Sequence, residues 1–152
     1  MDISQDETDI KFMQAALREA RAAAAADEVP IGAVVTDPAG RIIGRGHNLT
    51  ETLCDVTAHA EMQAITAACA TLGGKYLQDC TLYVTVEPCL MCAGAIGWSQ
   101  VGRIVFGCTD PKRGYSTYTA NPFHTRASVT HGVLADECSA LVQDFFKTKR
   151  QR

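Results

Sequence analysis

The fold class of this chain is decided by the stretch Thr81-Leu82-Tyr83-Val84-Thr85-Val86-Glu87-Pro88-Cys89-Leu90-Met91-Cys92. Its first six residues are β-branched, aliphatic or aromatic, which is typical of a buried strand. Pro88 suits the first turn of a helix, and this helix is expected to end near Ser99. A strand that leads directly into a helix indicates an α/β fold with parallel strands.

Segments on both sides of this unit predict further helices and strands. The expected helices cover residues 8–26, 57 or 59 to 72, 88–99 and 135–149, and the expected strands cover residues 31–36, 41–44, 81–86, 103–107 and 129–134. The first two strands form a hairpin through Asp37-Pro38-Ala39-Gly40. Residues 109–126 have no clear period and are interpreted as a long surface loop. The pattern predicts a single three-layer α/β domain over residues 1–152, with a mixed sheet.

The composition is that of a globular intracellular protein. The chain has 152 residues, of which 47% are hydrophobic and 20% charged, close to the globular average. The alanine run at 22–26 is far shorter than the ~20 residues of a membrane span, so no membrane association is expected. Residues 1–7 are acidic and lack the apolar stretch of a signal peptide. The odd number of cysteines, seven, indicates reduced thiols and a cytoplasmic location.

Positive charge is concentrated in the last third of the chain. The formal net charge is −3, but residues 101–152 contain eight Lys and Arg against four Asp and Glu. The negative overall charge argues against indiscriminate coating of DNA. The excess of positive charge in residues 101–152 is still compatible with a local basic surface.

Two short segments carry residues suited to metal chemistry, and each lies at an expected helix start. Cys89 and Cys92 can place two sulfurs on one cation, because the helix N-terminus favours the thiolate form. His59 can supply a third ligand, and water the fourth, which is the arrangement of a catalytic zinc site. Two thiolates reduce the acidity of the water on such a zinc ion, so the reaction needs a separate base. Glu61 is the candidate for that base.

Each of these residues also has a simpler interpretation when it is taken alone. The cysteine pair fits a thioredoxin-like redox motif, His59 fits a hydrogen-bonded structural histidine, and Glu61 fits a carboxylate in the first turn of a helix. A non-catalytic zinc-binding module is another alternative, but the open ligand position and the nearby Glu61 argue against it. The joint occurrence favours catalytic zinc. The other five cysteines show no close pairing and are interpreted as small apolar residues.

The two segments together resemble the H-x-E…P-C-x-x-C pattern of the zinc-dependent nucleobase deaminases. Over residues 10–150 the chain resembles in particular the bacterial tRNA-specific adenosine deaminases. The stretches that carry this resemblance are Glu28–Val35, Gly46–Asn48, Thr57–Glu61, Thr81–Cys89, Gly132–Cys138 and Asp144–Phe146.

The resemblance implies a fold, a reaction and roles for individual residues. The fold would be the three-layer α/β/α cytidine-deaminase-like fold with a five-stranded mixed sheet, in a homodimer. One zinc ion per chain would be bound by His59, Cys89 and Cys92, and Glu61 would transfer protons. Asn48 would hydrogen-bond the purine, and Asp110 would lie near the ribose or backbone of the target nucleotide. The reaction would convert adenosine to inosine at the wobble position of a tRNA anticodon.

A second substrate class is compatible with the same residues. Residues 112–125 are more aromatic than the family pattern at this place, and a deaminase of free guanine, cytosine or a nucleoside would use the same zinc site. Taken alone, Asn48 and Asp110 are also typical turn formers. The residues expected to contact RNA are Lys112, Arg113, Lys147, Lys149 and Arg150, with Tyr115 and Tyr118 available to stack on unpaired bases.

Overall fold

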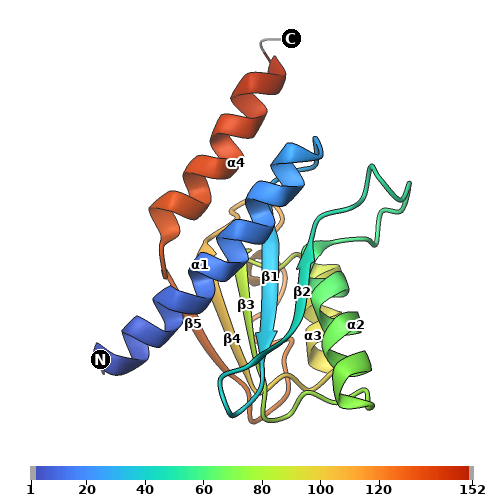
Figure 1. Cartoon of the computed structure of the whole chain (residues 1–152), viewed down its shortest axis with the longest axis vertical. Helices are drawn as coiled ribbons and strands as arrows, with labels where there is room; N and C mark the ends of the chain where they lie inside the picture. Colours follow the sequence, from blue (N-terminus) through green and yellow to red (C-terminus); the bar gives the residue numbers. More distant parts are fainter. Residues whose placement is uncertain (1–2, 151–152) are drawn as a thin grey trace.

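The computed structural model describes residues 3–150, with side chains described from residue 7 onward. The helices are α1 (Ile3–Ala25), α2 (Ala60–Leu72), α3 (Leu90–Trp98) and α4 (Ala135–Arg150), with a 3-10 turn η1 (Tyr115–Thr117). The strands are β1 (Gly32–Thr36), β2 (Ile42–His47), β3 (Thr81–Val86), β4 (Arg103–Cys108) and β5 (Ser128–His131). Figure 1 shows that α4 extends beyond the end of the sheet.

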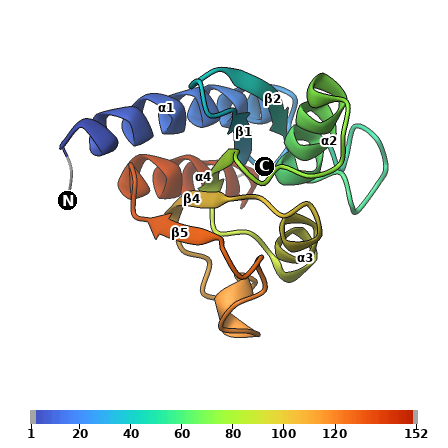
Figure 2. The ribbon, with the colours of Figure 1, turned by 90° about the horizontal axis from the view of Figure 1, so that it is seen from below.

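The five strands form one mixed sheet in the order β2-β1-β3-β4-β5. β1 is antiparallel to both β2 and β3, whereas β3, β4 and β5 run parallel to one another. Helices α1 and α4 cover one face and α2 and α3 cover the other, as Figure 2 shows. The prediction of a three-layer α/β/α fold with a five-stranded mixed sheet is therefore confirmed.

The central strands are buried on both faces, as their composition predicts. Along β3, Leu82 and Val84 pack with α2 and α3, while Tyr83 packs with α1 on the opposite face. The same alternation separates Ile104 from Val105 along β4. Side chains of a strand point alternately to the two faces of its sheet, so each central strand contributes to both apolar cores.

A close contact between β2 and α2 sets the position of the second helix. A Cβ atom added to Gly46 would lie 2.5 Å from the Ala60 carbonyl oxygen and 2.6 Å from the Ala64 nitrogen. Only glycine leaves room for the helix backbone to approach the strand at this distance. The first turn of α2, and with it His59, is thereby held against the end of the sheet.

The prediction that Pro88 lies in the first turn of its helix is wrong, because α3 begins at Leu90 with Cys89 as the N-cap. Three other element boundaries differ from the prediction by three residues or more. α1 begins at Ile3, before the expected start at residue 8, because its first turn lacks the apolar spacing on which that prediction relied. β2 extends to His47 because its pairing with β1 continues to the Gly32–His47 pair. β5 ends at His131 because Gly132 adopts a left-handed backbone conformation with φ of 90°.

A buried ion pair joins α1 to the sheet. The Arg103 guanidinium donates two hydrogen bonds to the Asp9 carboxylate, at 2.7 and 2.8 Å, and the Tyr83 hydroxyl donates a third at 3.0 Å. Asp9 is almost fully buried. Burial and the Asp9 charge both raise the pKa of Tyr83, so its hydroxyl stays protonated and continues to donate.

Replacing Asp9 with asparagine is expected to destabilise the fold by about 2–4 kcal/mol. The change leaves the Arg103 charge without its ion-pair partner in a largely desolvated position. The check is urea unfolding monitored by circular dichroism. A midpoint equal to that of the unmodified protein would show that the pair contributes nothing to stability.

The long segment 109–126 is only partly the surface loop that was predicted. Tyr115 and Phe123 are buried, and their rings pack edge-to-face at 4.8 Å between centroids. Tyr115 also packs against Phe106 of β4. The expectation that Tyr115 stacks on unpaired bases is therefore wrong, because its ring belongs to the core. Tyr118 stays exposed.

Among the described residues, no helix has the length and apolar character needed to cross a membrane.

Candidate active site

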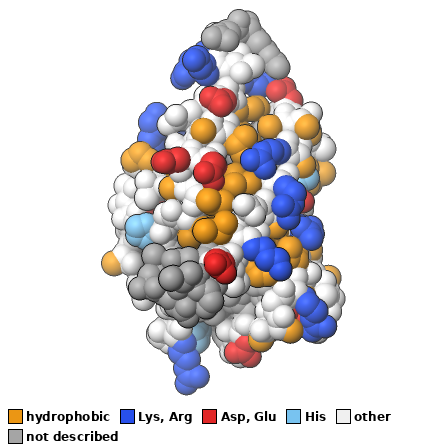
Figure 3. Space-filling model, turned by 60° about the vertical axis from the view of Figure 1, so that its left-hand side comes forward, with side chains coloured by type: hydrophobic (Ala, Val, Ile, Leu, Met, Phe, Trp, Pro, Cys, Tyr) orange, Lys and Arg blue, Asp and Glu red, His pale blue; other side chains and the backbone are white. Residues whose placement is uncertain are grey.

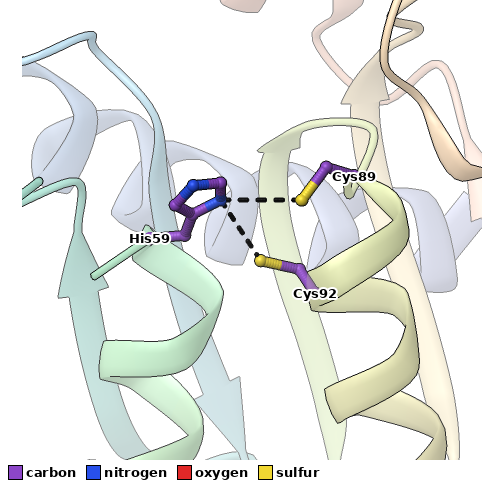
Figure 4. A group of neighbouring side chains, drawn as sticks. All are labelled: His59, Cys89 and Cys92. Atoms are coloured by element: carbon purple, nitrogen blue, oxygen red, sulfur yellow. Dashed lines mark hydrogen bonds between the residues drawn. The ribbon is translucent and has the colours of Figure 1, made fainter. Parts of the chain in front are cut away.

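The predicted metal ligands meet where α2 and α3 begin. His59 precedes α2 and Cys89 precedes α3, and both have extended backbone conformations at the N-cap position. Neither side chain caps its own helix, so both point into the space between the two helices. Cys92 lies in the first turn of α3 and is fully buried. Figure 4 shows both sulfurs facing the same nitrogen of the His59 ring.

The spacing of these donors fits a tetrahedral zinc ion. His59 Nδ1 lies 3.6 Å from Cys89 Sγ and 3.4 Å from Cys92 Sγ, and the donor atoms of the three residues lie within 4.8 Å of one another. Ordinary Zn–N and Zn–S bond lengths with tetrahedral angles give a nitrogen–sulfur separation of ~3.6 Å. The residues therefore fit zinc with Nδ1 as the histidine donor. Three protein ligands leave a fourth position for water or substrate.

The electrostatics of the group favour a thiolate. Hydrogen bonding from Cys92 and His59 lowers the pKa of the Cys89 thiol to about 4, although burial acts in the opposite direction. The hydrogen bond to Cys89 raises the pKa of His59, while the proximity of Cys89 and burial raise the pKa of Cys92. A thiolate is the form of cysteine that binds zinc.

Glu61 lies beside the three donors in the first turn of α2. Its side chain is buried, with 4% of its surface exposed. Burial, reinforced by the charge of Cys89, raises the pKa of Glu61 to about 7. A carboxyl group with such a pKa can both accept and donate a proton near neutral pH, which is what general acid–base catalysis requires.

A pocket of about 220 Å³ is lined by His59, Glu61 and Cys89. This volume is below the ~300–1,000 Å³ of sites for drug-sized ligands, so the pocket suits a single small ring system. Its lining includes five of the six predicted site residues, whereas Cys92 is buried and does not line it. The lining residues are Val29, Ile31, Asn48, Thr50, His59, Ala60, Glu61, Val86, Glu87, Cys89, Asp110 and Arg113.

Asn48 and Asp110 line the pocket and also form turns. The Thr50 N–H donates a hydrogen bond to Asn48 Oδ1 at 3.1 Å, so the amide N–H groups are what Asn48 can offer to a base. Asp110 Oδ1 accepts hydrogen bonds from the N–H groups of Lys112 and Arg113, both at 3.1 Å. For these two residues the turn interpretation is correct, and it coexists with a place in the pocket.

Comparison with known proteins identifies this type of site. Residues 6–108 match the cytidine and deoxycytidylate deaminase zinc-binding region. The chain belongs to the zinc-dependent cytidine and deoxycytidylate deaminase family. Its cofactor is accordingly zinc, and the deaminase is a zinc-dependent hydrolytic enzyme.

Two curated relatives cover nearly the whole deaminase. The tRNA-specific adenosine deaminase of Bacillus subtilis (strain 168) is 45% identical, over 99% of this chain and 94% of the relative. The tRNA-specific adenosine deaminase of Haemophilus influenzae is 44% identical, over 97% of this chain and 88% of the relative. These matches place the deaminase among the tRNA-specific adenosine deaminases.

Solved structures share the fold of the deaminase. One, from studies of A-to-I editing by tRNA:A34 deaminases at the wobble position of transfer RNA, has a TM-score of 0.80 and 43% identity, covering 86% of this chain and 98% of the other. A guanine deaminase from Nitrosomonas europaea has a TM-score of 0.77 and 28% identity, covering 90% of this chain and 83% of the other. The same fold therefore occurs with both substrate classes.

Sequence reasoning missed two buried carboxylates beside the pocket. Glu28 is fully buried and accepts hydrogen bonds from the Glu51 N–H at 3.0 Å and from the N–H and hydroxyl of Thr52 at 2.6 and 2.7 Å. Burial raises its pKa, but these hydrogen bonds outweigh burial, so the net pKa of Glu28 is lowered. Glu87 is the second buried carboxylate. Its place directly before the Pro88–Cys89 pair is the sequence signal that could have identified it.

The interpretation of the remaining cysteines is partly wrong. Cys80 and Cys138 are buried in the core, as expected for small apolar residues. Cys54 is instead exposed, in the loop between β2 and α2. Cys54 is not one of the three metal donors, so it can serve as a control in experiments on Cys89 and Cys92.

Proposed function

We propose that the deaminase converts adenosine to inosine at the wobble position of a tRNA anticodon. The observation that carries the proposal is that Glu61 lines one small pocket together with His59 and Cys89, two members of the His59–Cys89–Cys92 group. The near-full-length similarity to tRNA-specific adenosine deaminases supports the choice of substrate. In the reaction, water replaces the amino group at C6 of adenine and ammonia leaves, without any change of oxidation state.

Each residue of the site has a defined task in this proposal. His59, Cys89 and Cys92 would hold the zinc ion. When bound there, zinc would act as a Lewis acid that makes a water molecule more acidic. Glu61 takes a proton from the attacking water, passes it to the purine ring nitrogen, and assists departure of the amino group as ammonia. Asn48 donates hydrogen bonds that orient the base.

The burial of Glu61 favours an unpaired nucleotide of a loop as the substrate. A base must leave its stack to reach Glu61, which is almost fully buried. Unstacking is least costly for an unpaired base, and an anticodon loop presents such bases. The basic and apolar surface next to the pocket suits the rest of the loop.

A groove of about 910 Å³ lies next to the catalytic pocket and shares Val86, Asp110 and Arg113 with it. Its walls combine apolar side chains from α4, such as Val142 and Phe146, with positive charge. The basic lining residues are Lys112, Arg113, Lys149 and Arg150. Figure 3 shows one face of the molecule, on which hydrophobic side chains form a strip with Lys and Arg along one side and Asp and Glu along the other. A groove lined by apolar and basic side chains can contact phosphates and bases that flank the target nucleotide.

Removing residues 147–152 is expected to raise KM for tRNA and to flatten its salt dependence. The deletion removes four positive charges, so the slope of log affinity against log salt falls by up to about 3. Residues 151–152 lie outside the described part of the chain. Zinc content stays unchanged, since the metal-binding group lies elsewhere. Initial rates against tRNA concentration at two salt levels check this, and identical curves for both proteins would exclude RNA contact by the tail.

A free-base deaminase is the second candidate, supported by the structural similarity to the Nitrosomonas europaea guanine deaminase. The two candidates differ in what the protein must contact beyond the pocket. Ammonia release is measured for one zinc-loaded preparation with tRNA, guanine, cytosine and cytidine separately. Release with tRNA and not with the small substrates is the expected result. Turnover of guanine without turnover of tRNA would establish the second candidate.

We also propose that the deaminase forms a homodimer through α3. Three apolar side chains on this short helix are exposed to solvent: Leu90 by 47%, Met91 by 38% and Trp98 by 85%. Met91 and Trp98 are seven residues apart and lie on the same side of the helix, and Leu90 is adjacent to Met91. A second copy of the chain can cover this face, because apolar surface of this kind is typical of subunit interfaces.

Replacing Trp98 with glutamate is expected to convert the homodimer to a monomer. The variant places a glutamate charge in the proposed apolar interface, which costs several kcal/mol. It also removes the apolar area that the Trp98 ring would bury in the dimer. Light scattering coupled to size-exclusion chromatography measures the mass of each form. The exposed Tyr118, lying on a different segment, provides a control when it is changed to glutamate. A monomeric unmodified protein would contradict the proposal.

A further inference from the structure

We propose that Glu87 is a positioning residue that fixes one wall of the substrate pocket. The wall is defined here as residues Asp110–Ser116, of which Asp110 and Arg113 line the pocket. The inference rests on the proposed function, because it concerns how the pocket receives its substrate. Glu87 also lines the pocket, but its carboxylate is engaged by the wall and takes no part in the proton transfers assigned to Glu61.

The Glu87 carboxylate accepts three hydrogen bonds from the wall. The Asp110 N–H donates to Oε1 at 3.1 Å, and the N–H and hydroxyl of Ser116 donate to Oε2 at 3.0 and 2.6 Å. Glu87 is buried, with 5% of its surface exposed. Both ends of the wall are therefore attached to one side chain that is shielded from water.

Backbone contacts place the same wall against the metal-binding segment. The Tyr115 N–H donates to the Pro88 carbonyl at 2.9 Å, and Gly114 forms an isolated antiparallel bridge with Cys89. A Cβ atom added to Gly114 would overlap the Glu87 carboxylate. The wall thus packs directly on the residues next to a metal ligand, with glycine providing the space.

A carboxylate is the side chain that suits three donors. It offers acceptor sites on both oxygens and carries no donor of its own when ionised. A glutamine in the same place would turn an amide N–H₂ towards the Asp110 N–H or the Ser116 N–H, in either orientation. At least one end of the wall would then lose its acceptor.

A second buried carboxylate acts in the same way on the other side of the pocket. Glu28 accepts its hydrogen bonds from the backbone of Glu51 and Thr52, next to Thr50, which lines the pocket. Two loops that bound the pocket are thus each held by one buried glutamate. This independent instance supports the assignment of Glu87 as a positioning residue.

The test compares Glu87→Gln with the unmodified protein. We expect KM for an anticodon stem-loop RNA to rise about tenfold while kcat changes by less than about threefold. The variant loosens the two ends of the wall, whereas the Tyr115–Pro88 hydrogen bond still holds its middle against the metal-binding segment. Zinc content stays at one ion per chain. Hydrogen exchange followed by mass spectrometry is expected to show faster exchange across residues 110–116.

Two further variants keep the test decisive if Glu87→Gln folds poorly. Gly114→Ala displaces the wall without altering any charge and is expected to raise KM in the same way. Asp9→Asn is the matched control, because it removes a buried carboxylate on α1 and is expected to lower stability without changing KM or exchange at residues 110–116. Unchanged exchange and KM in both wall variants would overturn the inference. Failure of the unmodified protein to act on tRNA would instead refute the proposed function, while the exchange measurement would still decide the role of Glu87.

Discussion

Glu61→Ala is expected to lower kcat on tRNA by at least ~10²–10⁴-fold, the range for loss of a general acid–base group. A larger loss is expected if one carboxylate serves every proton transfer. Zinc content should remain at one ion per chain, because the three donors are His59, Cys89 and Cys92.

Glu61→Gln sharpens this experiment because glutamine keeps the size of the side chain but cannot transfer the proton. Both variants are compared with the unmodified protein for zinc content, by elemental analysis, and for inosine formation under single-turnover conditions. Equal loss in both variants assigns the effect to proton transfer. Activity close to normal in either variant would mean that another group is the base.

Cys89→Ser is expected to abolish stoichiometric zinc binding and to lower thermal stability. A ligand held at a thousand times its Kd stabilises the folded state by about 4 kcal/mol. In a domain of this size that corresponds to a decrease of about 8–16 °C in Tm. The loss follows because metal binding and folding are coupled when the site forms only in the folded chain.

Cys54→Ser is the matched control for the Cys89 variant. Cys54 is exposed and lies outside the group of metal donors. The Cys54→Ser variant should have the same zinc content as the unmodified protein, measured by elemental analysis. It should also have the same Tm, measured by differential scanning fluorimetry. Full zinc content in Cys89→Ser, or equal loss in both variants, would contradict the assignment of Cys89 as a ligand.

The strand and helix that carry the cysteines could be predicted because local sequence determines them. Six residues of strand composition are followed by Glu87 and the Pro88–Cys89 pair, and β3 and α3 follow that order. His59 was predictable as a partner because it begins a second helix. The structure adds the reason why the two helix starts meet, which is that Gly46 lets α2 approach the sheet closely.

The pocket wall could not be predicted from the sequence, because it depends on which strands are neighbours. Asp110 comes close to Glu87 because β3 and β4 are parallel partners, with Val86 paired to Cys108. Nothing in the local sequence of residues 109–126 indicates this pairing. The same lack of local signal explains the error for Tyr115, since an aromatic residue in a loop can turn either to solvent or to the core.

The residues whose roles depend on substrate are predicted less completely than the metal site. Asn48 and Asp110 line the pocket together with Glu61, as their places in the deaminase motifs suggested. Their side-chain oxygens also form turns, which restricts the groups that each can offer to a nucleotide. Their contributions to substrate binding stay predictions.

The most direct test of the account is sequencing of an anticodon stem-loop RNA after incubation with the zinc-loaded deaminase. Reverse transcription reads inosine as guanosine, so editing appears as a change at a single position. We expect this change at the wobble adenosine, with none at the other adenosines of the loop and none with Glu61→Ala. An unedited wobble adenosine, in a preparation that contains one zinc ion per chain and deaminates free guanine, would contradict it.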